Sequence, residues 1–213
     1  MPDFSKLSTP FSNISNVIHG SQDLPPEEKR KRFEHFLTNR RRMTRLALIQ
    51  SAYYFEQRRL VNKEMESTEA LKLNEEVNEI YRVVIFFYKK VFFPNRYGDS
   101  QKTKKLEEKF LRHLIEGIIT TRDELDGHIK KYLKKGWTVM RLDSIVRSAL
   151  RCATYEAIYR YGTETKVIIS EYVQLVAGMM GECREINFIN AILDKIVNDV
   201  RSSKNDNNDV AQN

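Results

Sequence analysis

The chain has 213 residues, of which 41% are hydrophobic, and its 36 Lys or Arg against 29 Asp or Glu give a formal net charge of +7. This length suits one core with polar tails, and the charge favours polyanionic partners without choosing among them. Only eight Gly and five Pro interrupt the sequence, which favours an all-α chain.

The sequence pattern also excludes an obvious membrane segment. Residues 1–20 lack the continuous apolar core of a signal peptide. The most apolar run, VVIFFY at residues 83–88, is far too short to span a bilayer. Cys152 and Cys183 lie in apolar helical patterns, which indicates buried free thiols rather than a disulfide framework. We therefore expect a cytoplasmic protein without a membrane partner.

The N-terminal third separates a polar leader from a basic segment. Residues 1–25 are rich in Ser, Asn and Pro, which predicts a disordered leader. Pro25 and Pro26 followed by EEKRKRFEHFL are typical of a helix start. From Pro26 to Lys63 there are eleven Lys or Arg and four Glu, an excess equal to that of the whole chain. Such a localised excess indicates a binding surface more readily than uniform basicity does.

Residues 40–57, RRRMTRLALIQSAYYFEQ, predict a helix with arginines in its opening turns. At about 100° per residue, one stripe holds Arg42, Arg45, Ile49 and Tyr53, with Arg41 at its edge. A second stripe holds Ala47, Leu48, Ser51, Ala52 and Phe55. The second stripe suits a core, while the first offers cations and a ring to the phosphates and bases of single-stranded RNA. The same pattern is typical of a solvated basic helix face, so this segment alone leaves both interpretations open.

The middle of the chain predicts three further helices. Residues 64–75 are polar and acidic, as in a connection or a fraying helix end, and PNRYGDSQ at 94–101 has the residues of a loop. Helical spacing of apolar residues marks one helix through Val77, Ile80, Val84, Phe87, Tyr88 and Val91, and another through Leu106, Phe110, Leu114 and Gly117. Thr121 with Glu124 fits a capping box that opens a helix ending near Gly136.

The C-terminal part predicts three more helices and a tail. The first runs from Leu142 to about Gly162, the second from Thr165 to Met180 with Gly181 at its end, and the last contains Ile189, Leu193, Ile196 and Val200. Residues 202–213 turn to Lys, Asn and Asp, which predicts a disordered polar tail. The expected organisation is one all-α domain over residues 26–201, a bundle of about six or seven helices.

The residue pattern favours no catalytic chemistry. None of the four histidines pairs with another His, Cys or carboxylate at a metal-ligand spacing, and there is no glycine-rich phosphate loop. We therefore expect no catalytic residues, no metal and no cofactor. Trp137, beside Gly136 at a helix boundary, is typical of a packing anchor between helices.

Residues 142–196 resemble the C-terminal half of the NusB family. The matching residues are Leu150, Arg151, Ala153, Tyr155, Glu156, Lys166, Val167, Ile169, Glu171, Phe188, Asn190, Leu193 and Asp194. The N-terminal helix of that family also has an arginine-rich start, followed by Arg, Gln and Tyr at the spacing of Arg45, Gln50 and Tyr53. Leu125, Asp126 and Trp137 fit its middle, and the resemblance spans roughly residues 40–198.

This resemblance implies an all-α fold of two small helical subdomains and a function in transcription antitermination. Members of the family bind the boxA element of ribosomal RNA leader transcripts together with a small-subunit ribosomal protein that doubles as NusE. The complex helps RNA polymerase to read through terminators. The residues carried over as RNA contacts are Arg41, Arg42, Arg45, Gln50 and Tyr53. Replacing Arg42 or Arg45 by Ala is then expected to weaken RNA binding and leave the fold intact.

Several features leave alternatives open. The sequence departs from the family pattern at Val146, where an acidic residue is common, at Ser170 and at Ala191. Arg151 and Glu156 are expected to tie the two subdomains together rather than to bind RNA. A protein-interaction bundle without RNA binding, or a NusB-like accessory domain of an RNA methyltransferase, would share the helical pattern. The sequence is compatible with a monomer and with a homodimer that covers the arginine face.

Overall fold

The computed structural model describes residues 40–61, 70–92, 108–160, 162–181 and 184–210. Within these ranges the chain forms seven α-helices and one 3-10 turn, and no strand, so the all-α prediction is confirmed. The elements are α3 (Arg40–Val61), α4 (Ala70–Phe92), α5 (Glu108–Thr120), α6 (Arg122–Lys130), η2 (Val139–Arg141), α7 (Ser144–Tyr159), α8 (Thr165–Met180) and α9 (Arg184–Val210). None of the described helices is long and apolar enough to cross a membrane.

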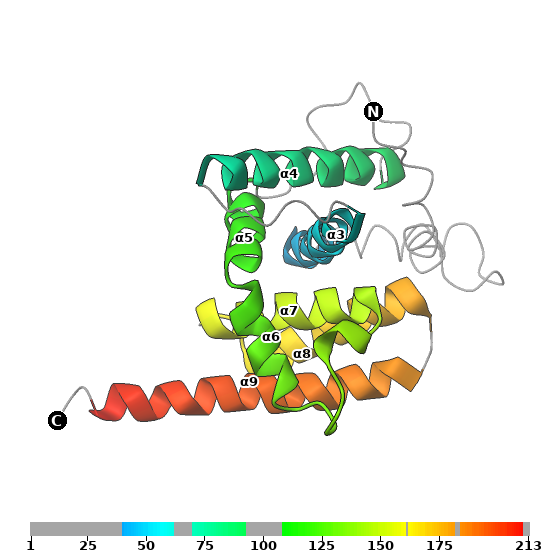
Figure 1. The fold of residues 1–213 in the computed structure, drawn as a ribbon. Coiled ribbons are helices and arrows are strands. Elements are labelled where there is room, and N and C mark those ends of the chain that lie inside the picture. Colours follow the sequence, from blue (N-terminus) through cyan, green and yellow to red (C-terminus); the bar gives the residue numbers. More distant parts are fainter. Residues whose placement is uncertain (1–39, 62–69, 93–107, 161, 182–183, 211–213) are drawn as a thin grey trace.

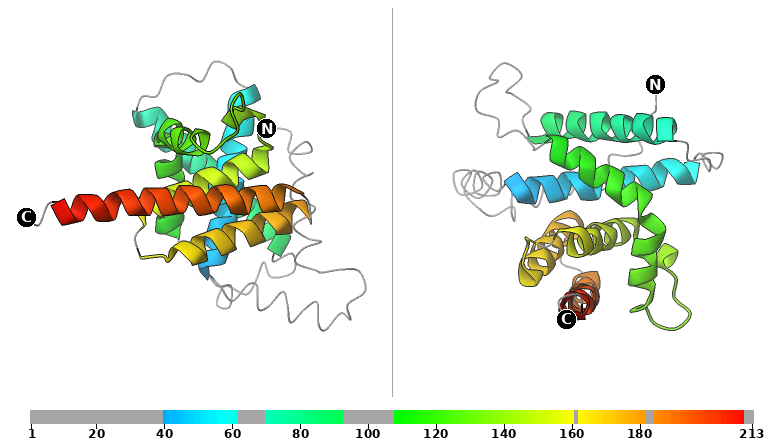
Figure 2. Two further views of the ribbon diagram at one scale, coloured as in Figure 1. Left: turned by 90° about the horizontal axis from the view of Figure 1, so that it is seen from below. Right: turned by 90° about the vertical axis from the view of Figure 1, so that its left-hand side faces the viewer.

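The helices form two groups that meet along α3. In Figure 1, α4 lies above α3, and α7, α8 and α9 lie below it, with α5 and α6 descending along one side. The right-hand view of Figure 2 shows the same order from α4 down to α9. α3 packs on α4 and α5 in its own group and on α7 and α8 in the other. This arrangement agrees with the expected two helical subdomains.

Both stripes of α3 contain buried residues, because the helix lies between the two groups. Ala47, Leu48 and Phe55 of the apolar stripe are at most 5% exposed. Ile49 is fully buried and Arg45 is only 6% exposed, although both lie on the stripe expected to face solvent. A helix flanked on two sides loses its solvent face, so its amphipathic pattern alone does not show which stripe stays open.

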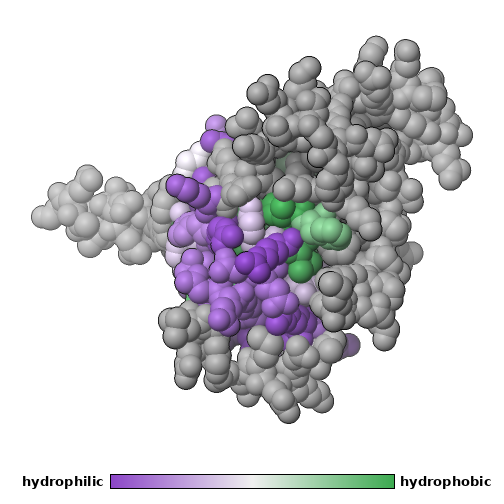
Figure 3. Space-filling model, turned by 90° about the horizontal axis from the view of Figure 1, so that it is seen from above, coloured by the Kyte–Doolittle hydropathy of each residue, from purple (hydrophilic) through white to green (hydrophobic). Residues whose placement is uncertain are grey.

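α4 forms the outer layer and is amphipathic. Val77, Ile80 and Val84 are buried as their spacing predicted, whereas Asn74 and Arg82 are exposed. Seen from the α4 side, the part of the surface formed by described residues is mainly hydrophilic, with one small hydrophobic area (Figure 3). The helix begins at Ala70, so of the two alternatives expected for 64–75 the structure shows a helix end rather than a connection from that residue onward.

The predicted helix boundaries agree for α8 and differ for α6. α8 spans Thr165–Met180 as expected and ends at Gly181, whose φ of 81° lies in the left-handed region that glycine tolerates. The expected capping box at Thr121 is wrong, because the Thr121 hydroxyl donates to the carbonyl of Gly117, 2.8 Å away, and makes no cap to α6. α6 ends at Lys130, well before Gly136, as bonds of the tighter 3-10 type close its last turn.

The chain end also differs from the sequence prediction. α9 continues to Val210, so residues 202–210 are helical rather than a disordered tail. This stretch contains no Gly or Pro, and adding residues to an existing helix costs far less than nucleating one. The leader predicted for residues 1–25 and the loop predicted for 94–101 lie outside the described residues.

A close approach of α5 and α7 depends on Gly117. A Cβ placed on Gly117 would lie 2.0 Å from Oη and 2.3 Å from Cζ of Tyr155. Tyr155 is 5% exposed, so its ring has little room to move away. The missing side chain at Gly117 therefore lets the Tyr155 ring fill the space between the two helices.

We expect Gly117→Ala to destabilise the protein by about 1–3 kcal/mol, because the added methyl group overpacks this contact. Gly127→Ala is the matched control, since Gly127 lies inside α6 and nothing is within 4 Å of its Cβ position. That change should stabilise the fold by about 0.5–1 kcal/mol through helix propensity. Chemical denaturation followed by circular dichroism measures both. Equal effects of the two substitutions would contradict the packing role of Gly117.

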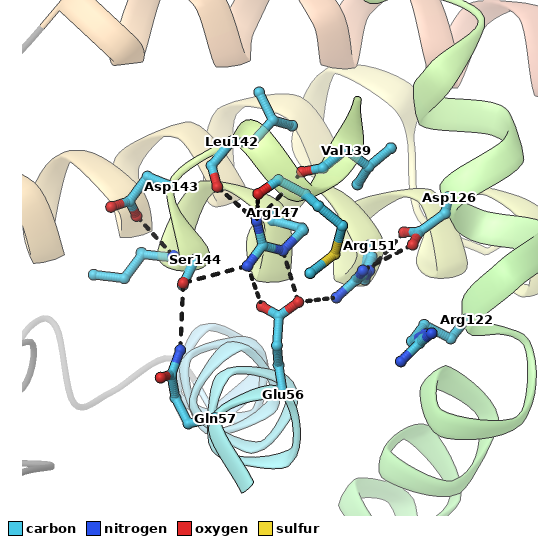
Figure 4. A network of polar contacts seen from close by, with 12 residues as sticks. Glu56, Gln57, Arg122, Asp126, Val139, Leu142, Asp143, Ser144, Arg147 and Arg151 are labelled. Atoms are coloured by element: carbon cyan, nitrogen blue, oxygen red, sulfur yellow. Dashed lines mark hydrogen bonds and ion pairs between the residues drawn. The ribbon is translucent and has the colours of Figure 1, made fainter. Parts of the chain in front are cut away.

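A buried ion-pair network joins α3 to α7 (Figure 4). Arg147 donates from Nε to Oε1 of Glu56 at 2.7 Å and from Nη2 to Oε2 at 2.8 Å. Arg151 donates to Oε1 of Glu56 at 3.1 Å and makes two bonds of 2.6 and 2.8 Å to Asp126 of α6. The side chains of Glu56, Arg147 and Arg151 are at most 7% exposed. Glu56 thus bridges two guanidinium groups at the centre of the interface, and Asp126 supplies the second negative charge.

Glu56→Ala should lower the free energy of unfolding by about 3–5 kcal/mol, because it leaves two buried arginines without their shared acceptor. Glu79→Ala is the control, because Glu79 pairs with Arg58 nearer the surface and is 43% exposed. A surface pair of this kind contributes only about 0–1 kcal/mol. The two variants are compared by urea denaturation. A loss at Glu56 no larger than that at Glu79 would refute the central role of the network.

Candidate functional site

The arginines of α3 change from exposed to buried along the first turns of the helix. Arg41 is exposed, Arg42 is half-buried, and Arg45 is buried. Because α3 enters the space between the two helical groups near this end, each turn takes the arginines deeper. Arg41 and Arg42 are thus the members of the predicted site that lie nearest to solvent on this helix.

Arg42 connects the start of α3 to α8. Its Nε donates to Oε2 of Glu171 at 2.9 Å, and its Nη2 donates to Oε1 of Glu171 at 2.6 Å and to Oε1 of Gln174 at 2.8 Å. The side chain of Arg42 retains 21% exposure. A two-point contact of this geometry fixes the plane of the guanidinium group at the protein surface.

Arg45 belongs to the interior. It makes two bonds of 2.9 and 2.6 Å to Glu156 of α7, and its Nη1 lies 3.6 Å from Glu171. The hydroxyl of Tyr172 donates to the same Glu156 carboxylate at 3.1 Å. Glu171 therefore lies between Arg42 and Arg45 and brings these two predicted residues together. The structure supports a structural role for Arg45, so the expectation that Arg45→Ala leaves the fold intact is corrected.

The electrostatics at Arg45 favour a fixed ion pair. Burial opposes the charge of Arg45, but the hydrogen bond and the charge of Glu156 outweigh it and raise the pKa of Arg45 above its ordinary value. Burial likewise opposes the charge of Glu156, yet Arg45, Tyr172 and Thr163 together lower the pKa of Glu156. Both groups therefore stay charged at neutral pH.

The remaining two predicted RNA contacts, Gln50 and Tyr53, lie further along α3 toward its C-terminal end. Gln50 is 5% exposed, so its amide lies inside the protein. Tyr53 is half-buried. The pKa of Tyr53 is raised by burial and, to a smaller extent, by the negative charges of Asp143 and Glu56. Tyr53 is the predicted aromatic contact that keeps access to solvent.

The expectation that Arg151 and Glu156 tie the two subdomains together is confirmed. Glu156 binds Arg45 of α3, and Arg151 binds Glu56 of α3 and Asp126 of α6. Among the departures from the family pattern, Val146 is 2% exposed and belongs to the core, whereas Ser170 and Ala191 are exposed.

The sequence interpretation missed Glu56 and Arg147. The sequence contains an indication of this network, because Arg147 and Arg151 lie four residues apart on the largely apolar α7. Arginines buried on such a helix need carboxylate partners from another element. Trp137 was assigned wrongly as a buried anchor: it is 43% exposed, with the guanidinium carbon of Arg141 at 5.2 Å from its ring centroid. Cys152 is a buried free thiol as expected, and burial raises its pKa, which leaves it unreactive.

A family model, the sequences of known proteins and a solved structure all indicate the same family. A sequence model of the NusB family matches residues 43–198. A protein named transcription antitermination protein NusB from Caulobacter vibrioides is 35% identical over 103 residues, which cover 48% of this chain and 68% of that protein. The protein of the same name from Rhodopseudomonas palustris is 35% identical over 46% of this chain and 56% of its own length.

Two further matches extend over most of the domain. The transcription antitermination protein NusB of Sphingopyxis alaskensis is 32% identical over 161 residues, which cover 76% of this chain and 94% of that protein. A solved structure of T. maritima NusB matches with a TM-score of 0.52 and 25% identity, covering 74% of this chain and 90% of that one. Since the family model and the S. alaskensis relative both cover most of the chain, this protein belongs to the NusB family of transcription antitermination proteins.

Proposed function

We propose that this protein binds single-stranded, boxA-type RNA of ribosomal RNA leaders together with a small-subunit ribosomal protein acting as NusE, and that this complex promotes read-through by RNA polymerase. The observation that supports it is the start of α3, where exposed Arg41 and half-buried Arg42 present guanidinium groups at the protein surface. Guanidinium groups match phosphate geometry, and phosphate contacts supply most of the affinity for a nucleic acid.

The five predicted residues take different roles in this proposal. Arg41 and Arg42 contact the RNA backbone, and the half-buried ring of Tyr53 meets a base. Arg42 and Tyr53 lie on one stripe and are eleven residues apart, so the path between them is about 16 Å along the helix. Arg45 and Gln50 are positioning residues, because both are buried. Arg45 holds α3 against α7 and thereby fixes where Arg42 and Tyr53 stand.

Two other functions compete with this one. A helical interaction module would bind a protein partner and would show no salt-dependent affinity for RNA. An accessory domain of an RNA methyltransferase would act together with a methyl-donor-binding domain and would serve methylation of RNA rather than antitermination. Fluorescence titration of a labelled boxA-type RNA, with and without the ribosomal protein, separates these functions, and absence of binding in both titrations would reject the proposal.

Replacing both Arg41 and Arg42 by Ala should weaken boxA RNA binding and reduce the dependence of log affinity on log salt by about 0.7 for each lost phosphate contact. The control for lost charge is Lys109→Ala/Lys195→Ala, because both lysines are exposed on other helices. Since Arg42 also binds Glu171, Glu171→Gln removes that carboxylate and keeps the arginine. An unchanged salt dependence in the Arg41/Arg42 variant would reject these two residues as contacts.

Arg45→Ala should act on stability before it acts on RNA binding. The change leaves the buried carboxylate of Glu156 without its main partner and should cost about 3–5 kcal/mol in free energy of unfolding. The double variant Arg45→Ala/Glu156→Ala should recover part of this loss, because no unpaired charge then remains. Thermal and urea denaturation measure both effects. A fully stable Arg45→Ala protein with weakened RNA binding would instead make Arg45 a direct contact.

A further inference from the structure

A second cationic surface lies outside α3, between the end of α6 and η2. Residues 130–141, KKYLKKGWTVMR, hold five cations and no carboxylate. All five cations are exposed: Lys130, Lys131, Lys134, Lys135 and Arg141. We call residues 130–141 the α6–η2 basic segment. A run of exposed cations without a carboxylate favours a polyanionic ligand.

The segment also exposes an aromatic ring beside a guanidinium group. Trp137 is 43% exposed, and the guanidinium carbon of Arg141 lies 5.2 Å from the Trp137 ring centroid. Met140 next to it is 55% exposed. An exposed ring costs free energy in water, whereas a ring flanked by cations can stack an unpaired base while the cations meet its phosphates. This combination fits single-stranded nucleic acid better than it fits a simple anion.

The basic segment is held firmly in place rather than loosely attached. Nη1 of Arg147 donates to the carbonyls of Leu142 at 2.6 Å, Met140 at 3.0 Å and Val139 at 3.3 Å. The same Arg147 is bound to Glu56 of α3, as Figure 4 shows. At its other end, the hydroxyl of Tyr132 is hydrogen-bonded to Asp199 of α9. The segment is thus anchored to three helices.

These anchors connect the basic segment with the far half of α3. Gln57 of α3 donates to the hydroxyl of Ser144 at 3.3 Å. Asp143, the residue before it, accepts a hydrogen bond from the backbone of Ile145 as the cap of α7. The start of α7 thus contacts α3 directly and follows the basic segment in the chain.

We propose that the α6–η2 basic segment is a second RNA-binding surface, on which Trp137 stacks an unpaired base and the flanking lysines contact phosphates of the same strand. The inference rests on the proposed RNA-binding function and adds residues that lie beyond the arginine helix. The neighbouring carboxylates of Asp143 and Asp199 leave the segment with an excess of positive charge, since it contributes five cations.

Trp137 is the only tryptophan of the chain, so intrinsic tryptophan fluorescence reports this surface without a label. The full chain is titrated with a short boxA-type RNA and with the same RNA extended at either end by uridines, and total binding is followed in parallel by anisotropy of the labelled RNA. We expect the extended RNA to quench the Trp137 emission at the same concentrations at which it binds.

Two variants test the chemistry of the segment. Lys134→Ala/Lys135→Ala should reduce the slope of log affinity against log salt concentration by about 1.4, which is about 0.7 for each lysine. The control Lys109→Ala/Lys195→Ala has the same change in charge and should leave this slope unchanged. Trp137→Ala should weaken binding of the extended RNA by about tenfold through lost stacking. Circular dichroism confirms that each variant is folded.

The outcomes separate the two proposals. The second surface is overturned if the RNA binds by anisotropy but leaves the Trp137 emission unchanged, and if Lys134→Ala/Lys135→Ala has the same salt dependence of binding as the control. The proposed function would then still stand. Absence of any RNA binding would overturn both. Quenching by vesicles of anionic lipid but not by RNA would assign the segment to a membrane surface and would also overturn the inference.

Discussion

The buried pairs of carboxylate and guanidinium that join α3 to α7 and α8 are the constraint on which the rest of the structure depends. Glu56 of α3 accepts hydrogen bonds from Arg147 and Arg151 of α7, and Glu156 of α7 accepts hydrogen bonds from Arg45 of α3. A charge removed from water must meet its opposite with good geometry, because desolvation otherwise costs several kcal/mol for each ion. α3 supplies the carboxylate in the contacts of Glu56 and the guanidinium group in the contact of Arg45, and α7 supplies the opposite charges. A shift of α3 along α7 by one turn would therefore separate these pairs. The pairs thereby fix both the register and the rotation of α3.

That constraint decides what the arginine-rich helix can offer to RNA. The arginines at the start of α3 differ in their surroundings over a few residues, since Arg45 is buried in the interface with α7 and Arg41 is exposed. Arg42 lies between them, with its guanidinium fixed by Glu171 and Gln174 yet partly exposed. A guanidinium already held in one plane loses less conformational entropy when it binds a phosphate, so the ion pair and the proposed RNA contact support each other.

The same network also shapes the surface beyond α3. Arg147 binds Glu56 with one side of its guanidinium and three carbonyls around η2 with the other. The position of Trp137 and Arg141 is thus coupled to α3 through one buried side chain. The start of α3 and the α6–η2 basic segment are thus both held in place by charged side chains of the interface between the helices.

The sequence by itself determined the helical class, the family and several helix boundaries, because these depend on local spacing and on residues such as Gly181 that act within one turn. It also indicated that Arg151 and Glu156 are structural, since charges in an apolar helical stripe need partners. It could not show that the Thr121 side chain bonds back to α5 instead of capping α6, that α9 extends past Ser202 or that Trp137 is exposed. Only the tertiary structure decided which residues of α3 keep access to solvent, and therefore which predicted contacts lie at the surface. The physical reason is that a helical pattern records where apolar side chains lie around one helix, whereas burial of Arg45 and Gln50 depends on a second helix about a hundred residues away in the chain, whose position follows from pairing charges across the core.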